Sequence, residues 1–269
     1  MATIHSESLW VQGRHCHAWI GGPDDAPPVL LLHGGLGDSL LHWHRNFADL
    51  SADFRMLAPD LPGFGRTAPL PHPSYPAYAA WAAAFCDTAG AGHGLTVVGN
   101  SMGAVVARVF AATSPARVAR LVLVDGGRPF APTGLAGLAL RVPPLRDALI
   151  SILRRRATAR RALPTYLADP SLLSPALRRR LVRGIHSYIR VQRAILAAPP
   201  VPPHALAVAC PVQVIWGAED RLGRPTLAVG IAAELRADPP ILIPGAGHMP
   251  MLEQPAAFAG ALRGFMAGR

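Results

Sequence analysis

The chain has 269 residues, 51% of them hydrophobic, and a formal net charge of +10. This length suffices for one large domain with a sizeable core, with or without an inserted segment. No run approaches the roughly 18 uninterrupted apolar residues of a membrane span, and the first residues lack the pattern of a signal peptide. We therefore expect a cytoplasmic protein without integral membrane association. Three scattered cysteines argue against a disulfide framework or a zinc site: Cys16, Cys86 and Cys210.

Strand and helix signals alternate along the first 124 residues. Residues 10–20 predict two strands joined by a turn at Gln12-Gly13-Arg14, forming a hairpin at a sheet edge. Residues 29–32 are all apolar and lie between Pro-Pro and His-Gly-Gly, as a buried parallel strand would. Such βαβ spacing predicts an α/β fold with a mostly parallel central sheet flanked by helices. Helices are expected near 41–50, 77–89 and 102–112, and strands at 55–58, 95–98 and 121–124.

The alternation stops at Gly126-Gly127 and resumes near residue 204. Between these points the chain is rich in arginine and proline and has helical rather than strand signals. We expect a core domain made of residues 1–127 and 204–269, with a helical lid, residues 128–203, inserted after the sixth strand. The resumed part predicts strands at 212–216 and 241–243 and helices near 227–235 and 256–266.

The predicted lid carries the excess positive charge of the chain. Residues 141–193 hold 13 arginines and two acidic residues, and the rest of the chain is close to neutral. One face of its longest predicted helix is apolar and the other is basic. The apolar positions are Leu177, Leu181, Ile185, Ile189 and Leu196, and the basic ones are Arg178, Arg179, Arg180, Arg183, Arg190 and Arg193.

The most informative motif is Gly99-Asn100-Ser101-Met102-Gly103. It follows a predicted buried strand and precedes a predicted helix, which is the context of the G-x-S-x-G nucleophile elbow. In that context Ser101 lies on a sharp turn, and the glycines keep Cβ atoms out of it. Ser101 is therefore the candidate nucleophile.

Five landmarks together resemble the α/β-hydrolase superfamily. They occur in the family's order and at its separations, and they extend over nearly the whole chain except the predicted lid. The resemblance implies the α/β-hydrolase fold and no cofactor. The landmarks are His33-Gly34-Gly35-Leu36-Gly37, Asp60-Leu61-Pro62-Gly63-Phe64-Gly65, the elbow, Trp216-Gly217-Ala218-Glu219-Asp220 and Gly245-Ala246-Gly247-His248.

A serine hydroxyl needs a base to take its proton and an acid to orient that base. His248 is the candidate base because it follows a strand at the carboxyl edge of the sheet, where α/β active sites collect. Asp220 is the candidate acid, and the order Ser, Asp, His is the one this fold uses. Two alternatives stay open for the acid: Glu219, which adjoins Asp220, and Asp125, at a position where some relatives place the acid.

Attack by serine places negative charge on the substrate oxygen, so backbone N–H groups must already point at it. The N–H of Met102 is one candidate, since it follows the nucleophile. The other is expected from Gly35, with Leu36 next. Trp43, His42 and Met249 lie beside these catalytic loops in the sequence and are expected to line the pocket.

Serine at the elbow argues against haloalkane dehalogenases and epoxide hydrolases, which need a carboxylate there. A small-molecule acyl substrate remains: an ester, thioester or lactone. The elbow and His-Gly-Gly loop are also similar to those of meta-cleavage-product hydrolases, which cut a carbon–carbon bond beside a ketone. The stretch Gly35-Leu36-Gly37-Asp38-Ser39 departs from that group. A non-catalytic binding or biosynthetic accessory protein on the same fold is the alternative of another class.

The lid arginines allow three hypotheses. They form a solvated face; or Arg141, Arg146, Arg190 or Arg193 binds an anionic substrate; or the face docks an acidic carrier protein or an anionic membrane. Because the charge is confined to a lid over the pocket, we expect no nucleic-acid partner. The sequence shows no metal cluster, and the Gly-x-Gly of residues 63–65 lacks the third glycine and the distant acid of a nucleotide fingerprint.

Overall fold

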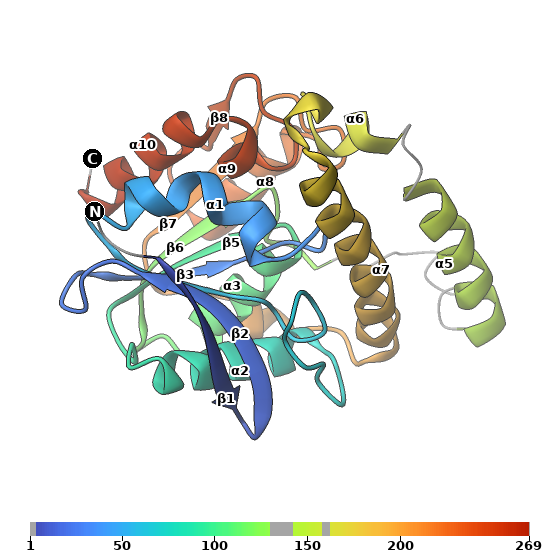
Figure 1. Ribbon diagram of the computed structural model, residues 1–269, viewed down its shortest axis with the longest axis horizontal. Helices are drawn as coiled ribbons and strands as arrows, with labels where there is room; N and C mark the ends of the chain where they lie inside the picture. The colour runs from blue at the N-terminus through green and yellow to red at the C-terminus, as the bar shows by residue number, and fades with distance from the viewer. Residues whose placement is uncertain (1–3, 130–141, 158–161, 269) are drawn as a thin grey trace.

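The computed structural model describes residues 4–129, 142–157 and 162–268. Its described part contains a mixed eight-stranded sheet of order β1-β2-β4-β3-β5-β6-β7-β8 (Figure 1). Only β1 and β2 run antiparallel to their neighbours, and β3 to β8 are parallel. The strands are β1 His5–Val11, β2 Arg14–Gly21, β3 Pro28–Leu32, β4 Arg55–Pro59, β5 Leu95–Asn100, β6 Val118–Val124, β7 Val212–Gly217 and β8 Ile241–Ile243.

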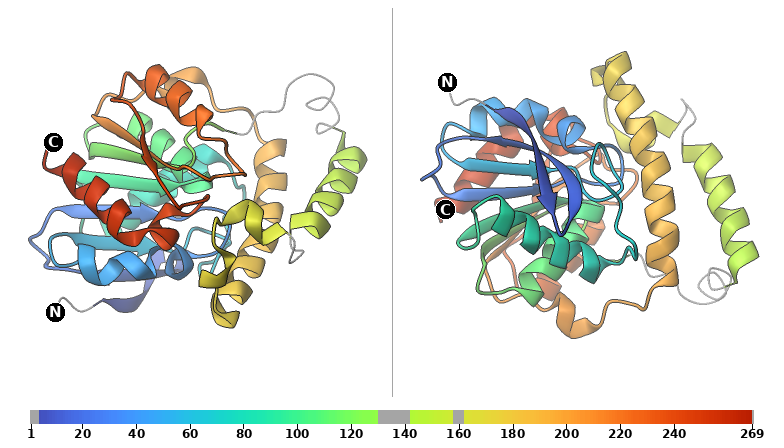
Figure 2. Two further views of the ribbon diagram at one scale, coloured as in Figure 1. Left: turned by 90° about the horizontal axis from the view of Figure 1, so that it is seen from above. Right: turned by 60° about the horizontal axis from the view of Figure 1, so that its bottom comes forward.

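Helices cover both faces of the sheet and make a core on each (Figure 2). One core holds residues of α2, α3 and α8, and the other holds residues of α1, α9 and α10. The predicted α/β architecture is therefore confirmed. The helices of this part are α1 Ser39–Leu50, α2 Tyr75–Thr88, α3 Met102–Thr113, α8 Thr226–Leu235, α9 Pro250–Glu253 and α10 Pro255–Met266.

The predicted element boundaries differ from the observed ones at strand starts and at helix caps. Strand β1 starts at His5 and β6 at Val118, five and three residues before the predicted starts. Helix α1 starts at Ser39 because the Asp38 carboxylate accepts a hydrogen bond from the Leu41 N–H at 3.0 Å. Helix α2 starts at Tyr75, capped in the same way by Ser74. A hydrophobic pattern marks the buried face of a helix, and its polar cap lies outside that pattern.

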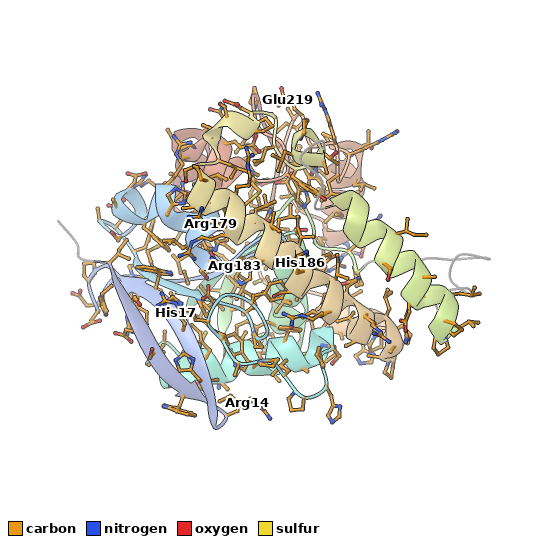
Figure 3. The ribbon with its side chains drawn as sticks, turned by 45° about the vertical axis from the view of Figure 1, so that its right-hand side comes forward. Arg14, His17, Arg179, Arg183, His186 and Glu219 are labelled. Carbon is orange, nitrogen blue, oxygen red and sulfur yellow. The ribbon has the colours of Figure 1, made fainter. Side chains whose placement is uncertain are left out.

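The chain between β6 and β7 forms a helical insertion at the carboxyl edge of the parallel strands (Figure 1). Its helix α7 carries Leu181 and Ile185 into the core, and both are about fully buried. Arg179, Arg183 and His186 are exposed on α7 (Figure 3). The amphipathic pattern of the sequence thus matches the burial along α7. The insertion contains α5 Pro143–Ala157, α6 Leu163–Tyr166, the 3₁₀ helices η2 Pro170–Leu172 and η3 Pro203–Leu206, and α7 Pro175–Ala197.

Helix α7 meets the core domain by close backbone approach. A Cβ atom at Gly184 would collide with the backbone of Gly37, in the loop after β3. Nearby, the Arg180 guanidinium donates to the Asp38 carboxylate at 2.5 Å. The insertion therefore contacts the loop that leads into α1 through both packing and charge.

Within the described ranges, no helix combines the length and apolar character that crossing a bilayer requires. The cysteines are free thiols; Cys16 and Cys86 are buried and Cys210 is half-buried. Burial raises the pKa of the Cys16 and Cys86 thiols to about 12. They behave as small core side chains.

Replacing Gly184 with alanine is expected to lower the free energy of unfolding by about 1–3 kcal/mol, because the added methyl meets the Gly37 backbone. The matched control is Gly260→Ala in α10, where an added Cβ meets nothing within 4 Å. There the better helix propensity of alanine should stabilise by up to about 1 kcal/mol. Urea unfolding measures both; equal effects at the two positions would contradict the packing of α7.

Candidate active site

The turn between β5 and α3 holds Ser101 in an uncommon backbone conformation, with φ 53° and ψ −114°. Non-glycine residues at positive φ are rare and concentrate at functional sites. The conformation depends on glycines. A Cβ at Gly99 would collide with the Gly103 backbone, one at Gly103 with the backbone of Leu32, and one at Gly126 with Ser101 itself. The sharp turn predicted for the elbow is present.

His248 and Asp220, 28 positions apart, meet at the carboxyl edge of the sheet. His248 Nδ1 lies 2.7 Å from an Asp220 carboxylate oxygen, and both side chains are buried. The other Asp220 oxygen accepts from the N–H groups of Leu222, at 2.8 Å, and Gly223, at 3.0 Å. Although burial alone would raise it, the hydrogen bond from His248 and that from Gly223 hold the pKa of Asp220 below its ordinary value.

The second ring nitrogen of His248, Nε2, is the one not bonded to Asp220. Ser101 and His248 line the same cavity. His248 Nε2 is buried and has no hydrogen-bond partner among the described residues, and no hydrogen bond joins it to Ser101 there. Catalytic hydrogen bonds are often long before substrate binds. The arrangement brings the three predicted residues to one site and leaves His248 Nε2 without a partner among the described residues.

The two alternative acids differ in position. Glu219 is exposed and accepts a hydrogen bond from the Ala246 N–H at 3.0 Å, away from the imidazole. Asp125 is buried beside the pair, and the ligand atoms of Asp125, Asp220 and His248 lie within 4.8 Å of one another. These three are the described side chains close enough together to share a metal ion. The hydrogen bond between His248 and Asp220 accounts for this closeness, and we assign no metal.

Gly35 and Met102 present free backbone N–H groups at the cavity. Neither N–H has a partner among the described residues, and both residues line the cavity with Ser101 and Leu36. The loop that contains Gly35 is fixed by a hydrogen bond, in which the Gly34 N–H donates to His42 Nε2 at 3.0 Å. His42 Nδ1 donates in turn to the Asp38 carbonyl at 3.0 Å, which fixes its tautomer. Burial holds the pKa of His42 well below its ordinary value, so the ring stays neutral.

The cavity has a volume of about 740 Å³ and lies between the core domain and the insertion. The core supplies Ser101, His248 and the ends of β6 and β7, and α6 and α7 form the other wall. Most of the lining is apolar. The insertion contributes Ala162, Thr165, Tyr166, Ile185, Tyr188, Ile189, Gln192 and Leu196.

Four residues predicted from the sequence to contact substrate lie elsewhere. Trp43 and Met249 are fully buried in the core, and His42 lies behind the Gly34 loop. Arg190 is exposed on α7 and donates to the Ser187 hydroxyl at 3.1 Å. Proximity in sequence to a catalytic loop did not identify the cavity wall, because His42 and Trp43 lie on the buried face of helix α1 and Met249 packs in the core.

Two polar residues support the site without having been predicted. Asn100 donates from Nδ2 to the His248 carbonyl at 3.1 Å, joining the elbow to the histidine loop. Glu253 accepts from the Gly247 N–H at 2.9 Å with one oxygen and from the Ala168 N–H at 2.6 Å with the other. The insertion also accepts at the Tyr166 carbonyl from the His248 N–H, at 3.0 Å. The position of Asn100 inside the elbow motif could have indicated its role from the sequence, whereas no sequence pattern pointed to Glu253.

Comparison with known proteins agrees with this geometry. A family model described as alpha/beta hydrolase fold matches residues 27–255. Carboxylesterase YbfK of Bacillus subtilis is 25% identical over 98% of this chain and 89% of its own length. A 2-hydroxy-6-oxononadienedioate/2-hydroxy-6-oxononatrienedioate hydrolase of Burkholderia vietnamiensis is 31% identical over 72% of this chain and 70% of its own. A thermophilic esterase of Thermogutta terrifontis superposes with a TM-score of 0.79 at 23% identity, covering 98% of both chains.

A strained serine between strand and helix, with a histidine and an acid at the same sheet edge, defines an α/β-hydrolase active-site arrangement. This chain belongs to the α/β-hydrolase family, and it is an enzyme of hydrolase type.

Replacing Glu253 with leucine is expected to lower kcat at least about tenfold and to destabilise the fold by about 1–3 kcal/mol, because backbone N–H groups of the histidine loop lose their acceptor. Glu253→Gln keeps one acceptor oxygen, so its kcat and its stability should lie between those of Glu253→Leu and wild type. Steady-state kinetics and thermal unfolding of the two variants test the series. Wild-type kinetics in Glu253→Leu would show that the carboxylate does not position His248.

Proposed function

We propose that this protein is a serine hydrolase that transfers the acyl group of an uncharged, apolar ester to water. The observation that carries the proposal is the 2.7 Å contact of His248 Nδ1 with Asp220. The other ring nitrogen has no partner among the described residues, and Ser101 lines the same cavity as His248. The proposal assigns Ser101 as nucleophile, His248 as general base and Asp220 as the residue that fixes the imidazole tautomer.

The proposed reaction has two halves. Ser101 Oγ attacks the ester carbonyl while His248 Nε2 takes its proton, and the carbonyl oxygen becomes an oxyanion facing the N–H groups of Gly35 and Met102. Collapse expels the alcohol, which receives the proton from His248. Water then attacks the acyl-enzyme by the same route and releases the acid. The free N–H groups support the oxyanion role, since their hydrogen bonds are unused before reaction.

The charge of the cavity wall supports a neutral acyl group. Arg128 is the single arginine among the described lining residues. It is already paired: its Nε donates to Glu234 at 2.8 Å, and Glu234 also accepts from Arg108 at 2.5 Å. Other arginines of the insertion are absent from the described lining: Arg146, Arg178, Arg179, Arg180, Arg183, Arg190 and Arg193. Arg141 lies outside the described residues. An apolar wall whose described residues include no unpaired cation favours an uncharged substrate.

Carbon–carbon hydrolysis is the second candidate function, and the charge of the cavity wall ranks it below ester hydrolysis. It is favoured by the likeness to the Burkholderia hydrolase, whose named substrates are dioates and therefore carry two carboxylates. Such a substrate needs an unpaired cation, which the described wall does not offer.

We further propose that residues 128–203 act as the lid of the cavity, because α6 and α7 form one of its walls.

A fluorophosphonate probe is expected to label the wild-type protein and to leave Ser101→Ala unlabelled, since activation depends on His248. Hydrolysis of p-nitrophenyl butyrate should fall at least about 1,000-fold in Ser101→Ala and in His248→Ala. Ser8→Ala, an exposed position on β1, is the control and should match wild type. An unreactive wild type would instead favour a binding or accessory role.

Freeing Arg128 is expected to change substrate preference. Wild type should hydrolyse a neutral butyrate ester at least about tenfold faster, by kcat/KM, than the matching ester bearing a terminal carboxylate. Glu234→Gln removes the carboxylate that pairs Arg128 and should narrow this ratio. Glu219→Gln, an exposed residue outside the lining, is the control. A wild type that prefers the charged ester would contradict the proposed substrate class.

A further inference from the structure

We propose that Asp125 carries a proton and donates it as a hydrogen bond to the Asp220 carboxylate, so that it positions the acid of the triad and can replace it. This inference rests on the proposed function, since it assigns a positioning residue to that site. It concerns a residue that the proposed mechanism does not use.

The geometry places two carboxyl groups in one buried site. Asp125 follows β6 with φ 46°, a left-handed conformation that aspartate tolerates better than most residues. Its Oδ1 accepts from the Gly217 N–H, at the end of β7, at 3.0 Å. Its Oδ2 is buried and has no donor among the described residues. A carboxyl oxygen of Asp125, one of Asp220 and a ring nitrogen of His248 all lie within 4.8 Å of one another.

Two carboxylates this close in a buried site do not both ionise, because each destabilises the charge of the other. The donors decide which one holds the proton. Asp220 accepts from His248 Nδ1 and from two backbone N–H groups, whereas Asp125 accepts from one. The negative charge therefore resides on Asp220 and the proton on Asp125.

The neighbouring charges agree with this assignment. Burial first, and then the Asp220 charge, raise the pKa of Asp125 well above its ordinary value. Glu253, from the start of the C-terminal helices, faces the same site and adds to the rise, while the hydrogen bond from Gly217 opposes it. The protonated Asp125 is then a neutral donor, and its O–H satisfies the oxygen that otherwise has no partner.

This arrangement has two consequences for catalysis. In the wild type, the Asp125 O–H holds the Asp220 carboxylate in the orientation that His248 needs. When Asp220 is made neutral, its repulsion no longer adds to the effect of burial on the pKa of Asp125. Asp125 can then ionise and accept from His248 itself, as an orienting carboxylate.

The first test compares two Asp125 variants by the kcat for p-nitrophenyl butyrate. Leucine removes the donor to Asp220 and the acceptor for Gly217, and should lower kcat about 10- to 100-fold. Asparagine offers an N–H to Asp220 and an oxygen to Gly217, and should restore kcat to within about fivefold of wild type. Equal losses of kcat in Asp125→Leu and Asp125→Asn would overturn the donor role. Asparagine has nearly the shape of aspartate, so the kcat of Asp125→Asn tests the proposal even if the leucine variant folds poorly.

The second test uses replacement of Asp220. Asp220→Asn should lose about 100-fold in kcat, with Asp125 as substitute acid, and the double variant Asp125→Asn/Asp220→Asn should lose about 10,000-fold, the scale of a triad without a carboxylate. In Asp220→Asn the acidic limb of the kcat profile should move to higher pH, because buried Asp125 must ionise. Equal rates in the single and double variants would overturn the substitution.

These outcomes are separable from failure of the proposed function. If wild type fails to react with the fluorophosphonate probe, the serine mechanism is wrong, and no carboxylate is needed to orient His248. If wild type reacts and the Asp125 series shows no difference between leucine and asparagine, the mechanism stands and the shared proton is wrong.

Discussion

The site depends on the close backbone packing of the elbow. Ser101 can adopt φ 53° only because Gly99, Gly103 and Gly126 leave no Cβ atoms in the space around it. The strain of such a conformation, of order 1–3 kcal/mol, is held in place by the strand before it and the helix after it. The turn places Ser101 and Met102 side by side in the lining of the cavity. The proposed nucleophile and one proposed oxyanion donor thus come from one local constraint.

Polar contacts then join the separate loops of the edge into one site. His42 holds the loop of Gly34, Asn100 holds the loop of His248, and Glu253 ties that loop to the insertion. The Asn100 and Ala168 contacts link segments far apart in the chain, and each contact uses a buried side chain. Buried polar groups cost free energy unless they are hydrogen-bonded, so these networks specify a single arrangement of the loops. The geometry of the site is therefore a property of the whole edge of the sheet.

Much of this could be predicted from the sequence because the signals are local. An apolar run bounded by glycine and proline predicts a buried strand, and the elbow, the aspartate after β7 and the histidine after β8 each follow such a strand. Strand ends of a parallel sheet meet at one edge, which brought Ser101 and His248 to one cavity and Asp220 into hydrogen-bond contact with His248. The cavity wall could not be predicted in this way. It depends on how α7 lies over the core, and Arg190 and Trp43 illustrate the failure: the helical pattern does not say which residue faces the opening. The Asp125 carboxyl was weighed as a rival to Asp220, whereas the structure places the two side by side.

The most direct test of the account is the pre-steady-state hydrolysis of p-nitrophenyl butyrate, combined with mass spectrometry of the quenched protein. The account predicts a burst of p-nitrophenol approaching one equivalent when deacylation is slower, and a butyryl group on the peptide that contains Ser101. A butyryl group on a different residue, or turnover in which no acylated peptide can be trapped from wild type and activity survives in Ser101→Ala, would contradict it.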